Sequence, residues 1–76
     1  MAAVIFELTI ENGLDNEIIS VEPYENVGRA KKAALNFIEG EELRWPDWAE
    51  WKSIGRGHWA TNTGTHLFRI VKRKVK

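Results

Sequence analysis

The residues best suited to binding chemistry are aromatic and basic, and they gather in the second half of the chain. All four tryptophans lie between Trp45 and Trp59, in the segment RWPDWAEWKSIGRGHW. Tryptophan and arginine are enriched at the energetic centres of protein–protein interfaces. Aromatic and basic side chains together also suit single-stranded nucleic acid, where bases stack and phosphates are neutralised. The C-terminal segment FRIVKRKVK supplies the basic residues Arg69, Lys72, Arg73, Lys74 and Lys76.

Charge is divided unevenly along the chain, although the formal net charge is zero. All eleven acidic residues lie within residues 1–50, which carry only four basic residues, so this part has a formal charge of −7. Residues 51–76 carry the other seven basic residues and no acid, and therefore have a charge of +7. Such asymmetry indicates binding to nucleic acid or to another anionic surface. An alternative of equal weight is that the two parts neutralise each other within the fold.

Few residues offer the chemistry of an enzyme. The chain has no cysteine, which excludes a thiol nucleophile, a disulfide and a thiolate metal site. It also lacks a phosphate-binding P-loop and a serine-hydrolase motif. His58 and His66 are expected to lie near each other across the NTG turn, but no carboxylate is spaced to complete a metal site, so we interpret them as surface histidines. We expect no catalytic residue, no cofactor and no metal ion.

The segment SIGRGH is a weak candidate for an anion site. Its backbone amides and the Arg56 side chain could together hold a phosphate. A hairpin turn accounts for both of its glycines and is the favoured interpretation.

Alternating side chains predict a hairpin in the first third of the chain. Apolar and polar residues alternate over residues 3–10, and the segment IISVEPY resumes as a second strand. The Asn12-Gly13 pair between them predicts a turn, because both residues tolerate a positive φ. Pro23 is expected to end the second strand.

The period changes to that of a helix over residues 26–40, where apolar side chains recur at spacings of three and four. Asn26 is the expected N-cap and Gly40 the expected residue just past the C-terminal end. A connector over 41–48 precedes three strands joined by glycine-containing turns. The segment LFRIV is apolar on both faces, which places the last strand inside the sheet, beside the first.

These elements predict a single α+β domain over residues 1–76, with the order β-β-α-β-β-β. Its parts are a hairpin at 3–22, a helix at 26–40, the connector at 41–48 and a three-stranded part at 50–74. The helix is expected to pack across one face of an antiparallel or mixed sheet. The expected core residues are Phe6, Leu8, Ala34, Phe37, Ile38, Ile54, Phe68 and Ile70.

The tryptophans exceed what a core of this size readily holds. A two-residue turn at Arg56-Gly57 would set Ile54 opposite Trp59 and place Trp51 on the other face of its strand. Trp51 and Trp59 could then not both lie beneath the helix. We expect two or three tryptophans to be structural and one or two to be partly exposed.

The expected function is binding without catalysis. The first hypothesis is a module that engages a protein partner, as small accessory or inhibitor proteins of mobile elements and phages do; a homodimer through the same surface is a variant.

The alternative is a nucleic-acid-binding protein of low sequence specificity, in which the basic C-terminal strand, with Lys52 and Arg56, contacts phosphates while Trp51 or Trp59 stacks on a base. This alternative requires the acidic and basic parts to form opposite surfaces, because carboxylates repel a polyanion. The residues expected at the partner surface are Trp48, Trp51, Arg56, Trp59, Arg69, Lys72, Arg73 and Lys74.

The sequence predicts no signal peptide and no membrane span. The N-terminal segment MAAVIFELTI has no basic region, and Glu7 interrupts its apolar run. No stretch approaches the roughly 18 apolar residues that a membrane span requires. We therefore expect a soluble, cytoplasmic protein with no membrane partner.

Overall fold

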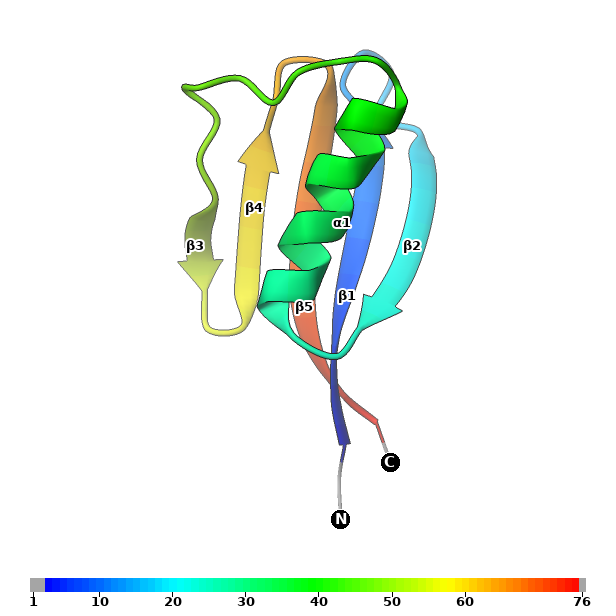
Figure 1. The fold of residues 1–76 in the computed structure, drawn as a ribbon. Helices are drawn as coiled ribbons and strands as arrows, with labels where there is room; N and C mark the ends of the chain where they lie inside the picture. Colours follow the sequence, from blue (N-terminus) through cyan, green and yellow to red (C-terminus); the bar gives the residue numbers. More distant parts are fainter. Residues whose placement is uncertain (1–2, 76) are drawn as a thin grey trace.

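The computed structural model describes residues 3–75 and shows one helix packed on a five-stranded antiparallel sheet (Figure 1). The predicted α+β fold and its element order are confirmed, and the sheet is antiparallel throughout. The strands lie side by side in the order β2-β1-β5-β4-β3. Along the chain the elements are β1 (Ala3–Asn12), β2 (Ile18–Tyr24), α1 (Val27–Gly40), β3 (Lys52–Gly55), β4 (His58–Asn62) and β5 (His66–Val75).

Strand β5 is the centre of the sheet, as its apolar sequence predicted. It pairs with β1 along its whole length, from Ala3↔Val75 to Asn12↔His66, and with β4 on its other side. Strand β2 forms one edge and runs past Pro23 to Tyr24, so the prediction that Pro23 ends the strand was wrong. Proline lacks an N–H donor, and an edge strand tolerates it because one side of the strand needs no partner.

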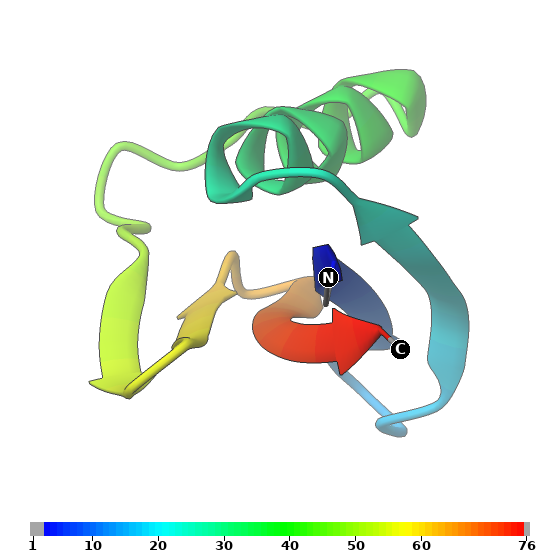
Figure 2. The same ribbon diagram turned by 90° about the horizontal axis from the view of Figure 1, so that it is seen from below.

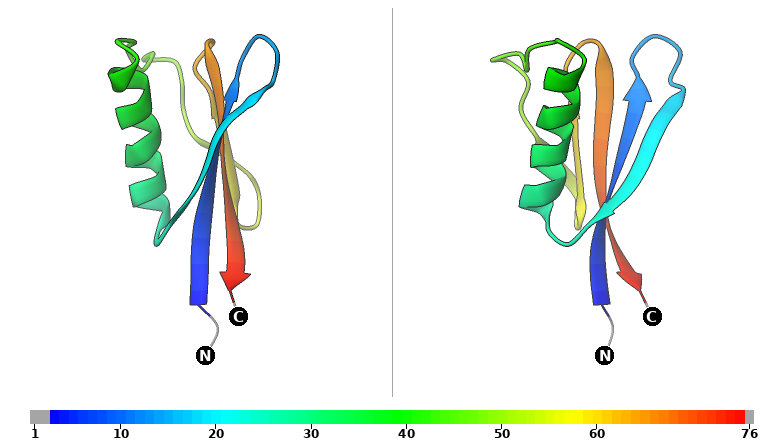
Figure 3. Two further views of the ribbon diagram at one scale, coloured as in Figure 1. Left: turned by 90° about the vertical axis from the view of Figure 1, so that its right-hand side faces the viewer. Right: turned by 45° about the vertical axis from the view of Figure 1, so that its right-hand side comes forward.

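Helix α1 lies across one face of the sheet, here called the helix face, and the opposite face, here called the open face, carries no helix (Figures 2 and 3). The core lies between α1 and the helix face, because even-numbered residues of β1 and β5 point toward the helix. Phe6 and Phe37 pack on the edge of this core and are half-buried. Ile54 is 57% exposed, so its predicted place in the core was wrong. The fully formed core cluster is Leu8, Ile10, Ala30, Ala34, Ile38, Phe68 and Ile70.

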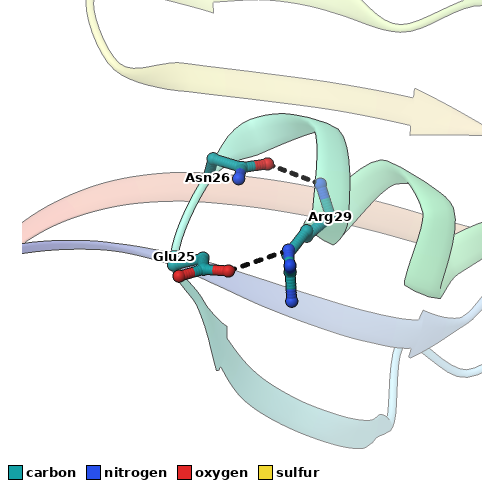
Figure 4. Close-up of polar contacts among 3 residues, drawn as sticks. All are labelled: Glu25, Asn26 and Arg29. Atoms are coloured by element: carbon teal, nitrogen blue, oxygen red, sulfur yellow. Dashed lines mark hydrogen bonds and ion pairs between the residues drawn. The ribbon is translucent and has the colours of Figure 1, made fainter.

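The helix begins as predicted and ends differently. The side chain of Asn26 accepts a hydrogen bond from the Arg29 backbone N–H at 2.8 Å, which confirms the N-cap (Figure 4). The Arg29 side chain also forms a 2.8 Å ion pair with Glu25. Gly40 was expected beyond the helix but is its last residue, and Glu42 instead takes the left-handed conformation, with φ at 61°. No helix in residues 3–75 is long and apolar enough to cross a membrane.

The turn between β1 and β2 uses its glycine for close packing. The predicted turn after Asn12 is confirmed, but the positive φ occurs at Asn16 (61°) and not at Asn12 or Gly13. The Gly13 N–H donates to the Thr65 carbonyl oxygen at 2.9 Å. A Cβ on Gly13 would lie only 2.8 Å from that oxygen. Gly13 therefore lets the β1–β2 turn lie directly against the β4–β5 turn.

Candidate functional site

Three of the four tryptophans pack against the core and the fourth is exposed. Trp45 stacks on Trp51 with ring centroids 6.0 Å apart, and both rings lie against Phe68. Trp59 also packs on the core cluster. Trp48 is 67% exposed. This division agrees with the expectation of two or three structural tryptophans.

The pairing of β3 with β4 differs from the pairing assumed for the sequence. Ser53 lies opposite Trp59, Gly55 lies opposite His58, and a bulge separates these two pairs. Trp51, two residues before Ser53, therefore falls on the helix face together with Trp59. The expectation that Trp51 and Trp59 could not both lie beneath the helix was wrong.

The basic residues of β5 divide between the two faces of the sheet. Arg69 and Arg73 point to the open face and pair there with glutamates of β1: Arg69 lies 3.5 Å from Glu11, and Arg73 lies 3.0 Å from Glu7. Opposite charges therefore alternate over the open face. The requirement that the acidic and basic parts form opposite surfaces is not met there, and this face does not provide the continuous basic surface that nucleic-acid binding needs.

A groove of about 640 Å³, here called the open-face groove, lies on the open face along β4. Ala60 lies at its middle, between Lys52 on β3 and Arg69 on β5. The groove forms because β3 pairs with β4 only as far as Lys52↔Ala60, while β4 continues to Asn62. Two exposed apolar side chains, Trp48 and Ile54, border the groove.

Trp48 is exposed but held in a fixed loop. The preceding Trp45 is anchored by its ring stacking, and its Nε1–H donates to the Ala49 carbonyl at 3.0 Å. Ala49 is buried, and its N–H donates to the Pro46 carbonyl at 3.1 Å. Two atoms of the Trp48 ring lie 3.6 and 3.7 Å from where a Cβ on Gly64 would be. The loop therefore holds the Trp48 ring beside the β4–β5 turn, with most of its surface in solvent.

Two buried polar atoms of β4 have no hydrogen-bond partner within residues 3–75. They are Thr61 Oγ1 and His58 Nε2. An unsatisfied buried polar atom costs about 1–3 kcal/mol, and such atoms are rare in folded proteins. His58 lies on the open face and lines the groove, whereas Thr61 lies opposite Phe68, so its side chain points to the helix face.

A second hollow, here called the basic cleft, has a volume of about 390 Å³ and lies on the helix face where α1 begins. It brings together four of the residues expected at a partner surface. None of its lining residues is acidic, and the three ion pairs among residues 3–75 involve none of its cations. The lining residues are Phe6, Val27, Arg56, Gly57, Trp59, Lys72 and Lys74.

The eight residues expected at a partner surface thus fall into separate places. Trp48 and Arg69 border the open-face groove, and Arg73 is paired with Glu7 elsewhere on the open face. Trp51 is half-buried against the core, with the Lys31 ammonium 6.0 Å from its ring centroid. Lys76 lies outside the described residues. The basic cleft holds the remaining four, Arg56, Trp59, Lys72 and Lys74.

Several lining residues were not expected at a binding surface, among them Ile54 at the groove and Phe6 and Val27 at the cleft. Side chains alternate between the two faces of a strand, and this period of two could have shown that the basic residues of β5 lie on both faces. It places Arg69 and Arg73 on one face of β5, and Lys72 and Lys74 on the other.

The two histidines lie at opposite ends of the β4–β5 hairpin, which contradicts the expectation that they are close. His58 pairs with Val71 and lies on the open face, whereas His66 lies on the helix face, with its ring 5.2 Å from that of Phe37. Residues 3–75 contain no group of three or more histidine, aspartate or glutamate side chains placed to hold a metal ion.

The chain has no significant match among protein-family models, curated proteins or solved structures. Its function is therefore inferred from the geometry of the open-face groove and the basic cleft.

Proposed function

We propose that the protein is a non-enzymatic binding module that engages a protein partner through the open-face groove, with Trp48 as the anchor. The observation that carries this proposal is the 67% exposure of Trp48 in a loop that is fixed on both sides. A side chain already held in place loses little conformational entropy on binding. Tryptophan is also among the residues most enriched at the centres of interfaces.

The shape of the groove favours an apolar segment of the partner. Trp48 stands beside Gly64 near one end of β4, and Ile54 stands near the β3–β4 turn at the other end. A volume of about 640 Å³ can hold one or two apolar side chains placed between them. Lys52 and Arg69 at the sides of the groove suit polar or acidic groups at the rim of such an interface.

A protein partner suits this groove better than a nucleic acid does. Arg69 already contacts Glu11, and Glu50 adds a further carboxylate to the lining. A polyanion would meet these carboxylates, whereas a protein surface can contact both charges. We also propose that the protein acts in the cytoplasm, as an accessory or inhibitor protein.

The test is a quantitative pull-down from a lysate of the source organism, with nuclease present. Trp48→Ala and Ile54→Ala are compared with Leu14→Ala, a matched control that is 97% exposed in the β1–β2 turn and does not line the groove. Removing an anchor typically costs about 2 kcal/mol or more, or roughly 30-fold in affinity. We expect the same protein to bind the wild type and Leu14→Ala, and to be lost from both groove variants.

Two further measurements separate the possible outcomes. Circular dichroism should show that Trp48→Ala is folded, because the side chain is mostly exposed. Sedimentation over a concentration series should show whether the groove joins two copies of the chain, in which case Trp48→Ala would abolish the dimer. Equal capture by the wild type and Trp48→Ala, with no change in self-association, would contradict the proposal.

A further inference from the structure

The basic cleft concentrates positive charge in a protein that is neutral overall. Arg56, Lys72 and Lys74 line it, and none of them takes part in the ion pairs found among residues 3–75. Val27, the first residue of α1, also lines the cleft, so the positive end of the helix dipole adds to the same field. A hollow lined by one sign of charge focuses its field on ligands of the opposite sign.

The backbone holds these cations together. The Lys72 N–H donates to the Gly57 carbonyl at 2.8 Å, which ties the β3–β4 turn to β5. Gly57 has φ at 72°, and a Cβ there would lie 3.0 Å from the Lys72 Cβ. Because the turn is fixed this closely to β5, Arg56 in the turn and Lys72 on the strand face one cleft.

Aromatic rings line the same cleft. The rings of Phe6 and Trp59 have centroids 6.0 Å apart and are tilted by 51°. Both residues line the cleft, and both are half-buried against the core, so their rings are held in place. Aromatic side chains beside cations are the arrangement that binds a nucleobase together with its phosphate.

We propose that the basic cleft binds a nucleotide unit, with the base against Phe6 and Trp59 and the phosphate against Arg56, Lys72 and Lys74. The cleft volume of about 390 Å³ lies within the range of small-ligand pockets. The ligand is either a free nucleotide or one unit of a single strand, since both present the same base and phosphate. The cleft lies on the helix face and the open-face groove on the opposite face, so the two ligands would contact different surfaces of the sheet.

The test measures binding of adenosine triphosphate by calorimetry and of a labelled thymidine strand of about ten nucleotides by fluorescence anisotropy. Three phosphate contacts predict a slope of log K against log[salt] of about −2.1 for the strand. The double variant Lys72→Gln/Lys74→Gln should reduce this slope to about −0.7. If the variant and the wild type bind equally at ~1 M salt, this difference in slope makes the variant bind roughly 60-fold more weakly at ~50 mM salt. The matched control is Lys32→Gln/Arg44→Gln, which removes two exposed cations outside the cleft and should retain most of the affinity.

The indole N–H signals of the wild-type protein provide a readout that needs no substitution. The proposal predicts that the Trp59 signal shifts on titration and that the Trp48 signal does not. Saturable binding of adenosine triphosphate would identify a free nucleotide as the ligand, and binding of the strand alone would identify a single-stranded nucleic acid. Three results would overturn the proposal: no binding of either probe at low salt, equal losses in the two double variants, or inorganic tripolyphosphate binding as tightly as adenosine triphosphate.

Discussion

Replacing Gly13 with alanine should destabilise the fold through a steric conflict between two turns. The new Cβ would lie 2.8 Å from the Thr65 carbonyl oxygen and 3.0 Å from the carbonyl carbon. Both are backbone atoms, so the conflict cannot be relieved by rotating a side chain. The turns would have to separate and would strain the 2.9 Å hydrogen bond from the Gly13 N–H. Overpacking and a weakened hydrogen bond together predict a loss of about 2 kcal/mol in the free energy of unfolding.

Gly40→Ala is a matched control with the opposite expected sign. Gly40 is helical, and a Cβ there would meet nothing within 4 Å. Alanine loses less backbone entropy than glycine on entering a helix, so the free energy of unfolding should rise by about 0.5 kcal/mol. Both variants add one methyl group, so an effect common to any added methyl cannot produce both results.

Urea unfolding followed by tryptophan fluorescence measures both changes. A domain of 76 residues has a free energy of unfolding of roughly 4–11 kcal/mol. With an m-value near ~1 kcal/mol/M, the midpoint for Gly13→Ala should fall by about 2 M. An unchanged midpoint for Gly13→Ala would refute the close contact of the two turns. A lower midpoint for Gly40→Ala would refute the open helical position of Gly40.

Three further predictions concern the helix cap, the exposed isoleucine and the ion pairs of the open face. Asn26→Ala should lower the free energy of unfolding by about 1 kcal/mol. The control Asn36→Ala, on the exposed side of the helix, should not lower it, and equal urea midpoints for the two variants would contradict the capping role. Ile54→Ser should change the free energy of unfolding by no more than about 0.5 kcal/mol, because Ile54 is 57% exposed. A loss of several kcal/mol in the same assay would show that Ile54 is part of the core. A double-mutant cycle on Glu7 and Arg73, measured by urea unfolding, should give a coupling free energy below about 1 kcal/mol that falls as salt rises. A larger coupling free energy that does not depend on salt would show that the pair is shielded from solvent.

Local periodicity was enough to predict the elements of this fold. The alternation over residues 3–10 and the apolar spacing in 26–40 follow from strand and helix geometry, which each segment expresses by itself. The N-cap at Asn26 is equally local, because its acceptor and the Arg29 N–H are three residues apart. Because the segment LFRIV is apolar on both faces, the sequence also predicted an interior strand. β5 is such a strand, since it lies between β1 and β4.

The pairing of β3 with β4 could not be predicted in the same way. It depends on where the bulge lies, and a change of one residue exchanges the faces of every side chain in the strand. The two-residue turn at Arg56-Gly57 is present, since Gly55 lies opposite His58. Without a bulge, this turn would set Ile54 opposite Trp59 and place Trp51 on the other face. The bulge between Ser53 and Gly55 reverses both outcomes. The role of Gly13 was hidden for a related reason, since its neighbour Thr65 is 52 positions away in the sequence and becomes close only in the folded sheet.

The candidate sites were predicted by residue type but not by position. The basic and aromatic residues of 51–76 were expected to form one surface, and they instead divide between two faces and the core. Ile54 joined the open-face groove because of the bulge. Phe6 and Val27 joined the basic cleft because β1 and α1 meet the end of β5 there, which is a tertiary contact that no local pattern encodes.

The position of the basic cleft explains how a protein with no net charge can concentrate positive charge in one place. Glu7 and Glu11 on β1 point to the open face, where they meet the arginines of β5. On the helix face, Lys72 lies opposite Phe6 and Lys74 lies opposite Val4, so no carboxylate of β1 faces these lysines. Strand β2 ends at Tyr24, opposite Phe6, and the chain leaves the sheet there to begin α1. Beyond Phe6↔Lys72, toward the strand ends, β1 pairs with β5 alone, and Figure 1 shows these two strands extending past the start of α1. Neither Lys72 nor Lys74 takes part in the ion pairs found among residues 3–75.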